Sequence, residues 1–333
     1  MNLVTGATGL LGTHLMMELL SRGQRVRALM RPGSNRKPVE EVFRFYGNTS
    51  YQAIEWVEGD VLDTESLEGA MDGCSHVFHC AAIVSYHPAQ RAEMYRINTE
   101  GTANVVNVAL LLGNVKLAFI SSIAALGKAK NLEHVNEEAE WVENEMTTHY
   151  AITKQLSEME FWRGLHEGIT GVAFNCGFII GPGSFERSSP SMFRKINEGM
   201  RYYPPGGTGF IAATDAAYCI AELTLGSITN ERFILVTENL SMKEVFQDVA
   251  RAIGARVPNR EAGTRILQLA RIAEWIKEKI SGRRALVTRE TVKNASLRFY
   301  YDNSKIRGAM KLDATPIRTA IEHTARFFRQ QTN

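Results

Sequence analysis

The sequence predicts a doubly wound α/β fold, in which helices cover both faces of a parallel sheet, followed by a smaller mixed α/β region. In the first half, short β-branched or apolar runs alternate with longer segments of helical periodicity. A glycine-rich turn also separates the first run from the first helical segment. Strands that alternate with helices favour right-handed crossovers, and these crossovers produce a parallel sheet.

The elements of this fold can be placed in order along the first half. The predicted strands are Asn2–Thr5, Arg25–Met30, a run from Ile54, His76–Cys80, Lys116–Ile120 and Gly171–Cys176. The predicted helices between them begin near Leu10, Val39, Glu65, Met94 and Tyr150. Gly23 and Gly73 stand where the first and third helices are expected to stop.

The alternating pattern breaks after about Cys176 into stretches rich in glycine and proline. Two further strands are predicted, Gly209–Thr214 and Arg232–Thr237. Ser241 with Glu244 forms a capping-box pattern, and Thr315 followed by Pro316 is typical of a helix start. The second region is therefore expected to be mixed and not cleanly separated from the first.

Composition narrows the classes of function. The 333 residues are 44% hydrophobic and 22% charged, which argues against disorder. With 38 basic and 36 acidic residues, the net charge of +2 gives no electrostatic case for nucleic acid. A small-molecule partner is the better expectation.

The four cysteines, Cys74, Cys80, Cys176 and Cys219, show no CxxC spacing. Neither a metal site nor a disulfide framework is therefore indicated, and reduced thiols fit a cytosolic protein. No apolar run approaches the roughly 18 residues that a membrane span needs. We expect a soluble, cytoplasmic protein.

The glycine-rich turn points to a dinucleotide. Gly6, Gly9 and Gly12 follow one another at intervals of three, between the first predicted strand and the first predicted helix. Such glycines permit a tight turn and bring the backbone close to a pyrophosphate, at which the following helix aims its free amides. The expected contacts of the dinucleotide here are Gly6, Thr8, Gly9, Leu10 and Leu11.

The end of the second strand bears on the choice of dinucleotide. An acidic residue at this place usually holds the ribose of NAD, whereas a basic one accommodates the extra phosphate of NADP. The chain has Arg31 there, without a carboxylate beside it in the sequence, so NADP is favoured and NAD remains an alternative. Arg36 or Lys37 could supply the cation instead.

Asp60 and Val61 follow the third predicted strand. Asp60 is placed to accept a hydrogen bond from the adenine amino group, with Val61 beside it. An aspartate before a helix is, however, often only a cap.

The stretch HYAITK places Tyr150 and Lys154 four residues apart on a predicted helix. Residues at this spacing lie on one helical face, so the two side chains can share a site. A phenol ordinarily titrates near 10, and a neighbouring cation lowers its pKa by favouring the phenolate. The pair is either a tuned proton donor or two surface residues that happen to have this spacing.

With these motifs, the chain resembles the extended short-chain dehydrogenase/reductase family, also called the NAD-dependent epimerase/dehydratase family. The motifs TGATGLLG, GDV, HCAA, YRINTEGTANV, FISSIAALG, HYAITK and GFIIGPG occur in the order and at the spacing of the family. Within it, RPGS, EMYRINTEGT and RFYYDNSKIRG are similar to dihydroflavonol-4-reductase-like and hopanoid-associated sugar-epimerase-like members.

The resemblance implies a catalytic set of Ser122, Tyr150 and Lys154. Tyr150 would donate a proton to a carbonyl oxygen as hydride arrives from the nicotinamide. Lys154 would lower the pKa of Tyr150 and bond the nicotinamide ribose. Ser122, with Ser121 as the alternative, would hold the substrate oxygen as it gains charge.

The resemblance also implies supporting positions and a dimer. Ala81 and Ala82 would line the nicotinamide ribose, Gly177 would shape the nicotinamide end, and Asn98 would either brace the structure or relay a proton. A homodimer is expected through the helices that begin near Met94 and Tyr150, with Ile152, Met159 and Trp162 near the interface.

The resulting division assigns residues 1–176 to a dinucleotide-binding Rossmann domain, to which 208–238 return. Residues 177–207 and 239–333 are assigned to a substrate-binding domain.

Three functions compete. The leading one is an NADP(H)-dependent reductase of a ketone or aldehyde on a moderately apolar substrate. The second is a sugar-nucleotide epimerase or dehydratase with retained NAD, which needs cations for a diphosphate, with Arg187, Arg194, Lys195 and Arg201 as candidates. The third is a non-catalytic dinucleotide sensor, since fold alone does not establish function.

A late amphipathic helix is predicted over residues 264–284. Its apolar face carries Ile266, Leu269, Ile272, Ala273, Ile276 and Ile280. We expect this face to pack on its own domain or to cap the substrate pocket. Contact with a membrane surface or a lipid substrate is the less favoured alternative.

Overall fold

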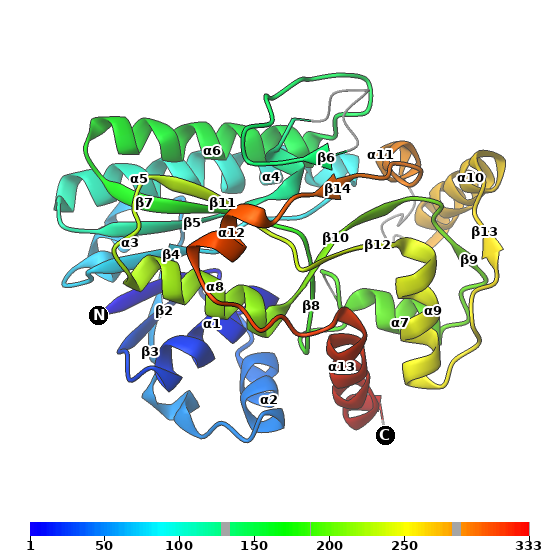
Figure 1. Cartoon of the computed structure of the whole chain (residues 1–333), viewed down its shortest axis with the longest axis horizontal. Helices are drawn as coiled ribbons and strands as arrows, with labels where there is room; N and C mark the ends of the chain where they lie inside the picture. Colours follow the sequence, from blue (N-terminus) through cyan, green and yellow to red (C-terminus); the bar gives the residue numbers. More distant parts are fainter. Residues whose placement is uncertain (128–133, 187, 282–287, 333) are drawn as a thin grey trace.

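The computed structural model describes residues 1–127, 134–186, 188–281 and 288–332, with the side chains of residues 277, 280 and 281 outside the description. Its centre is a seven-stranded sheet in the order β11-β7-β5-β4-β1-β2-β3, and all its strand pairs are parallel (Figure 1). These strands are β1 (Asn2–Thr5), β2 (Val26–Met30), β3 (Glu55–Glu58), β4 (His76–His79), β5 (Lys116–Ser122), β7 (Thr170–Cys176) and β11 (Glu231–Leu235). The chain order reverses between β1 and β4, and the crevice at such a reversal is where open α/β sheets bind ligands.

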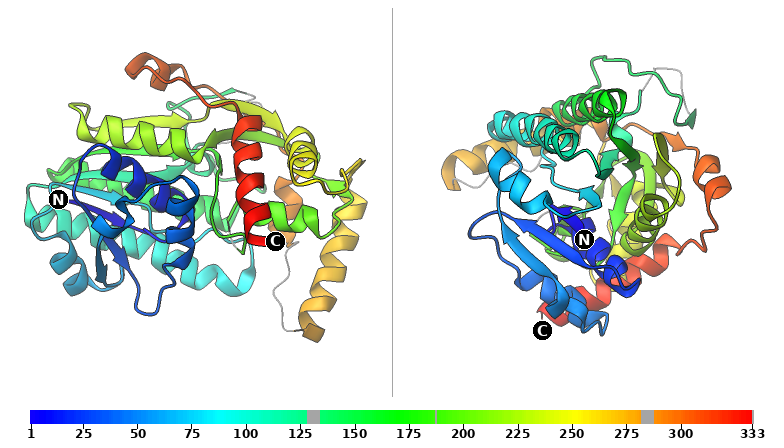
Figure 2. Two further views of the ribbon diagram at one scale, coloured as in Figure 1. Left: turned by 90° about the horizontal axis from the view of Figure 1, so that it is seen from below. Right: turned by 90° about the vertical axis from the view of Figure 1, so that its left-hand side faces the viewer.

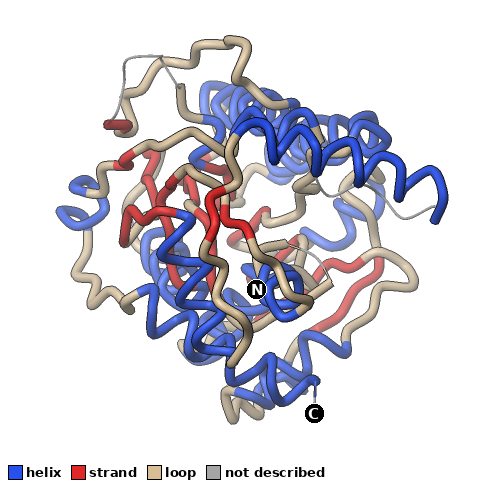
Figure 3. Tube along the Cα trace, turned by 90° about the vertical axis from the view of Figure 1, so that its right-hand side faces the viewer, coloured by secondary structure: helices blue, strands red, loops and turns tan. Residues whose placement is uncertain are grey.

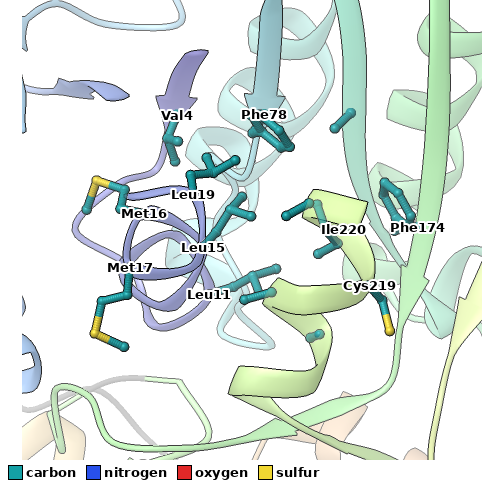
Figure 4. Packing of buried hydrophobic residues seen from close by; sticks show 14 of the residues in the cluster. Val4, Leu11, Leu15, Met16, Met17, Leu19, Phe78, Phe174, Cys219 and Ile220 are labelled. Atoms are coloured by element: carbon teal, nitrogen blue, oxygen red, sulfur yellow. The ribbon is translucent and has the colours of Figure 1, made fainter. Parts of the chain in front are cut away.

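Helices cover both faces of this sheet, which confirms the predicted doubly wound fold (Figure 1). One face carries α1 (Leu10–Ser21), α2 (Lys37–Phe45) and α8 (Ala213–Leu225). The other face carries α3 (Thr64–Met71), α5 (Gly101–Leu112) and α6 (His149–Glu167). Figure 4 shows Leu15 of α1 and Ile220 of α8 packed over Phe78 and Phe174 of the sheet.

The local signals of the sequence are found where they were expected. Each of the six strands predicted in the first half overlaps an observed strand. Gly23 and Gly73 follow α1 and α3 with φ of +70° and +67°, the left-handed conformation typical of a helix C-terminus. The capping box of Ser241 and Glu244 is also present.

The second part of the chain builds a small mixed sheet and its own core (Figure 2). In this sheet β10 (Gly207–Ala212) runs parallel to β8 (Phe178–Ile180) and antiparallel to β12 (Glu238–Ser241). The helices α7 (Ser191–Asn197), α9 (Met242–Ile253) and α13 (Ile317–Thr332) pack on it. The other elements are α4 (Arg91–Tyr95), β6 (His134–Val135), β9 (Tyr202–Tyr203), β13 (Arg260–Glu261), α10 (Thr264–Ser281), α11 (Arg289–Asn294), β14 (Tyr300–Tyr301) and α12 (Ser304–Ala309).

The two parts are joined by shared elements. The strand β11 belongs to the large sheet, and the helix α8 packs against a face of that sheet. The strand β10, which precedes both in the chain, lies in the small sheet. Asp215 of α8 accepts hydrogen bonds from the backbone N–H (2.7 Å) and the hydroxyl (2.8 Å) of Thr315. The helix α13 begins at Ile317, directly after the Thr315–Pro316 pair, so this clamp fixes its start on the large sheet.

Candidate active site

The turn after β1 fits a dinucleotide because it leaves no room for side chains. Gly6 has φ +63°, and a methyl group on it would lie 2.7 Å from the Ala81 nitrogen and from the Cys80 carbonyl. A methyl group on Gly12 would lie 2.4 Å from the Gly6 oxygen. The two loops at the switch between β1 and β4 therefore touch through backbone, which lets a ligand approach that backbone closely.

The N-terminus of α1 supplies the complementary charge. Gly9 is its N-cap and offers no side-chain cap, so the first-turn amides belong to Leu10 and Leu11. Leu11 has its side chain in the core, so only its backbone can take part in binding. Thr8, Gly9 and Leu10 line a pocket here together with Pro38 and Gly183. Free amides and a helix dipole at a pocket suit a pyrophosphate.

A buried histidine holds the loop after β4. His79 bonds the Thr5 hydroxyl through Nδ1 (2.8 Å) and the Thr102 hydroxyl through Nε2 (3.0 Å). Burial lowers the pKa of His79 to about 3, so this imidazole is neutral and structural. Thr5 Oγ1 also accepts from the Ala81 N–H (3.2 Å), which positions Ala81 beside Gly6, while Ala82 is exposed.

Arg31 lies exposed directly after β2. Of the other two candidate cations, Arg36 stacks over the Trp56 ring (5.5 Å) and Lys37 pairs with Glu41 (3.8 Å). The strand register adds a feature that the sequence analysis missed, because Glu58 of β3 stands opposite Met30. A carboxylate therefore lies near the end of β2 after all, on the neighbouring strand.

Asp60 and Val61 follow β3 as expected. Asp60 Oδ1 accepts from the Leu62 N–H (3.0 Å), and the N-cap of α3 is Asp63 instead. One oxygen of the Asp60 carboxylate therefore stabilises the turn in which Asp60 itself lies. Val61 is buried against Gly101, where a methyl group would lie 2.7 Å from Val61 Cγ2.

Ser122 and Tyr150 are brought together at the carboxyl end of β5. Ser122 is the last residue of β5, and Tyr150 lies in the first turn of α6, whose N-cap Thr148 accepts from the Ala151 N–H (3.1 Å). The Ser122 hydroxyl lies close enough to the Tyr150 phenol to lower its pKa. Ser121 instead donates to the Glu158 carboxylate (2.6 Å), so Ser122 is the serine that faces the tyrosine.

The lowered pKa predicted for Tyr150 is wrong for this structure. Burial, followed by the neighbouring Tyr86, raises the pKa of Tyr150 above its ordinary value, and the hydrogen bond from Ser122 offsets this in part. The Lys154 ammonium is engaged elsewhere, because Nζ donates to the Ile120 carbonyl (2.7 Å) and lies 4.8 Å from the Phe119 ring centroid. The phenol therefore keeps its proton at neutral pH.

Lys154 is 3% exposed, and burial lowers its pKa to about 8. The strongest opposing influence is the carboxylate of Glu158, one helical turn further on, which raises the pKa of Lys154. Glu158 was not anticipated, although positions 150, 154 and 158 fall on one face of a helix. This spacing is the sequence signal from which a role for Glu158 beside Lys154 could have been predicted.

Glu158 joins four elements beneath the site. It is 2% exposed and accepts hydrogen bonds from Ser121 (2.6 Å) and Asn175 (3.0 Å). Arg232 forms an ion pair with it (3.2 Å), and the Trp162 indole N–H donates to it at 3.4 Å. Asn175 also donates to the Ser122 carbonyl (3.0 Å), so the network fixes the strand end that carries the serine.

The contacts of Asn98 are those of a structural residue that links two segments. It lies in a π-helical turn, Arg96–Glu100, and its side chain bonds both backbone groups of Ile83 (2.7 and 2.9 Å) and the Thr153 hydroxyl (3.0 Å). It thereby ties the loop after β4 to α6. Gly177 follows β7 where a methyl group would lie 2.6 Å from the Gly209 oxygen, at the junction of the two sheets.

Comparison with known proteins identifies the family. A model of the NAD dependent epimerase/dehydratase family matches residues 2–222. The chain belongs to this family. It is 28% identical over 338 residues to a Synechocystis sp. protein provisionally named dihydroflavonol 4-reductase, covering 98% of this chain and 93% of that one.

Two further proteins are similar to this chain over nearly its whole length. Sterol demethylase protein B of Methylococcus capsulatus is 26% identical over 338 residues, covering 99% of this chain and 98% of that one. The crystal structure of gox2253 superposes with a TM-score of 0.80 at 26% identity, covering 99% of this chain and 98% of that one.

The C-terminal segment of this family member reaches α6, the helix that carries Tyr150. Glu290 of α11 accepts a hydrogen bond from the His149 N–H (3.1 Å) at the start of α6 and pairs with Arg91 (3.4 Å). The ring of Tyr86 meets that of Tyr150 edge to face at 6.1 Å. Two segments that the sequence analysis left unplaced therefore border the tyrosine.

Within the described residues, no group of three or more histidine, cysteine or acidic side chains could hold a metal ion. No helix in the described part of the chain is both long and apolar enough to cross a membrane.

Proposed function

We propose that this family member is an NADP(H)-dependent reductase that converts a ketone or aldehyde of moderately apolar character to an alcohol. The observation that carries the proposal is the buried phenol of Tyr150, whose pKa Ser122 at the end of β5 lowers through its hydroxyl, with the buried Lys154 one helical turn away. A proton donor, an oxygen-binding hydroxyl and a cation are what the reduction of a carbonyl group requires.

The dinucleotide, when bound, supplies the hydride that reaches the carbonyl carbon. Tyr150 holds the proton that the carbonyl oxygen needs, and burial keeps that proton on the phenol until negative charge develops on the oxygen. Ser122 donates a hydrogen bond to the same oxygen. Lys154, whose ammonium bonds the Ile120 carbonyl (2.7 Å), would hold the nicotinamide ribose, as the resemblance to the family implies.

The NADP preference is supported by Arg31. It is an exposed cation at the end of β2, whereas Arg36 and Lys37 are engaged with Trp56 and Glu41. A guanidinium pairs well with a phosphate. Glu58 opposite Met30 is the feature that keeps NAD as the alternative.

A reductase is favoured over a sugar-nucleotide epimerase because two of the four cations proposed for a diphosphate, Arg194 and Lys195, are engaged. Arg194 pairs with Glu186 and Glu198, and Lys195 is partly buried, where desolvation lowers its pKa and Glu274 opposes this. Arg201 is exposed, and Arg187 lies outside the described residues. The names of two relatives, a dihydroflavonol reductase and a sterol demethylase protein, also suit an apolar substrate.

A homodimer through α5 and α6 is part of the proposal. Met159 of α6 is 56% exposed and Leu111 of α5 is 69% exposed, on two helices that pack side by side (Figure 1). Trp162, by contrast, is partly buried on its own core and contacts Glu158 and Arg232. We also retain the division into a Rossmann domain (1–176 and 208–238) and a substrate domain, although β10, at the start of the second range, pairs in the small sheet. A reducing, cytoplasmic location is retained as well, and the four free cysteines agree with it.

The test is single-turnover oxidation of NADPH with a panel of apolar ketones and aldehydes. Tyr150→Phe keeps the packing of the ring and deletes the hydroxyl, so we expect the rate to fall by about 10² to 10⁴ while NADPH affinity is retained. Tyr300→Phe, a tyrosine that is 37% exposed, is the control. Near-normal turnover by Tyr150→Phe would contradict the mechanism, and nucleotide binding without turnover by the unmodified protein would indicate a sensor.

A further inference from the structure

The helix α10 presents apolar side chains to solvent, so the expectation that its apolar face packs on its own domain is wrong for Leu269, Ile272 and Ile276. The expected face also included the Ile280 side chain and the expected helix ran to residue 284, and both Ile280 and 282–284 lie outside the description. Leu269, Ile272, Trp275 and Ile276 are 67%, 47%, 57% and 46% exposed. Across the described residues, nine large hydrophobic side chains are at least 37% exposed, and four of them are on this one helix. Such clustering marks an interaction surface, since single exposed apolar residues are otherwise scattered.

The exposed residues form one line along the helix with a basic residue at each end. Arg265, Leu269, Ile272, Ile276 and Lys279 follow one another at intervals of four, three, four and three, the spacing of a single helical face. We call these five residues the α10 stripe. It runs about 21 Å along the helix, with Trp275 beside it.

The acidic residues of α10 are on the opposite face and are turned toward the protein. Glu278 pairs with His87 (3.0 Å), and Glu274 acts on Lys195 of α7 by raising its pKa. Arg265 and Lys279 are exposed, so the charges that accompany the apolar line into solvent are positive. The helix has therefore turned its mixed polar face inward and its apolar, basic face outward. Its backbone lies at the periphery of the molecule (Figure 3).

We propose that the α10 stripe binds the surface of an anionic lipid bilayer. Leucine, isoleucine and tryptophan side chains on one face of a peripheral helix enter the boundary between headgroups and acyl chains. Arginine and lysine at the ends reach sideways to anionic headgroups, and tryptophan is favoured at this depth. The proposal concerns a binding surface and does not depend on which reaction the enzyme catalyses.

The same charges argue against a second copy of the chain as the occupant. If two α10 stripes packed antiparallel, Arg265 of one would face Lys279 of the other. If they packed parallel, each cation would face its own equivalent. Either arrangement sets like charges together across an apolar contact, which is unfavourable, whereas an anionic bilayer complements both ends at once.

The α10 stripe is connected to the candidate active site by one loop. His87, the partner of Glu278, follows Tyr86, whose ring contacts that of Tyr150. A bilayer bound at the α10 stripe would thus lie on the outer side of α10, and the segment that borders Tyr150 contacts the inner side of the same helix.

Flotation of the full chain with vesicles tests the proposal. We expect binding to phosphatidylcholine vesicles that contain about 30 mol% phosphatidylglycerol, with roughly tenfold weaker binding to pure phosphatidylcholine and loss in high salt. Ile272→Glu with Ile276→Glu should reduce binding at least about tenfold, and Arg265→Gln with Lys279→Gln should reduce it roughly tenfold and remove the anionic preference. The tryptophan emission should shift to the blue on binding, and Trp275→Phe should abolish that shift.

Val142→Glu is the matched control, because Val142 is 44% exposed and Ile276 46%. It should bind vesicles as the unmodified chain does, and all variants should keep the same unfolding midpoint. No binding to anionic vesicles would overturn the proposal, as would binding that Ile272→Glu with Ile276→Glu leaves unchanged. A lipid-free increase in mass with concentration that Ile276→Glu abolishes would also overturn it and identify a second copy as the occupant.

Discussion

Replacing Glu158 by glutamine should lower the pKa of Lys154 without unfolding the site. Burial lowers the pKa of Lys154 to about 8, and Glu158 is the strongest influence that raises it. Residues one helical turn apart are roughly 6 Å from each other, so one charge contributes about 2 to 3 kcal/mol at an effective dielectric constant of about 20. Arg232 neutralises part of the Glu158 charge, and we therefore expect a decrease of about one pKa unit, to roughly 7.

The sign of the accompanying change in stability follows from proton binding. The folded-state pKa of Lys154 lies below the unfolded value of 10.5, so the unfolded chain binds more protons between pH 8 and 10.5. The contribution of Lys154 to the free energy of unfolding therefore rises with pH across this window and is smallest below pH 8. In Glu158→Gln the window should extend downward to about pH 7.

The assay is a lysine side-chain NMR titration of the unmodified chain and Glu158→Gln, with Lys154→Met to assign the resonance. Lys116 is an internal control, because burial lowers its pKa too while its ammonium bonds the carbonyls of Leu223 and Gly226. Its titration should not move. An unchanged pKa of Lys154 in Glu158→Gln would refute the electrostatic role and leave Glu158 as packing alone.

Three further predictions concern the cofactor loop, the choice of nucleotide and the dimer. Gly6→Ala should destabilise the fold by about 2 to 4 kcal/mol in urea unfolding and abolish nucleotide binding, whereas Gly23→Ala shares the positive φ but meets nothing within 4 Å and should cost only about 1 to 2 kcal/mol. Arg31→Ala should weaken NADPH binding roughly tenfold or more in calorimetry and leave NADH nearly unchanged, and equal losses would contradict the assignment. Met159→Asp should convert the dimer to a monomer by light scattering, and a single-chain mass for the unmodified protein would contradict the interface.

The large sheet could be predicted because its signals are local. Each strand is a short apolar run, each helix has its own period, and Gly23 and Gly73 mark ends that need a left-handed residue. The glycine loop was predictable for the same reason, since Gly6 and Gly12 are required by backbone contacts within one turn and its neighbour. The three catalytic candidates were found through the family's motifs, and of these only the spacing of Tyr150 and Lys154, one helical turn apart, is a local signal.

What the sequence analysis missed depends on register and on burial. Glu58 became a neighbour of the end of β2 only through the pairing of β3 with Met30. The clamp between Asp215 and Thr315 joins residues 100 positions apart, and no local pattern announces it. The sequence analysis also treated Lys154 as the only influence on Tyr150, whereas the pKa of a phenol depends as much on how fully the fold removes it from water.

For the helix α10, the sequence pattern predicted the element but not the direction in which its apolar face points. Its periodicity correctly predicted a helix with one apolar face, and the usual inference is that such a face is turned toward the core. Periodicity, however, specifies only which residues share a face. The direction of that face depends on what the rest of the fold offers, and here His87 and Lys195 meet the acidic residues of the polar face. Once those contacts hold the polar face inward, the apolar line has no place in the core, and its occupant has to come from outside the chain.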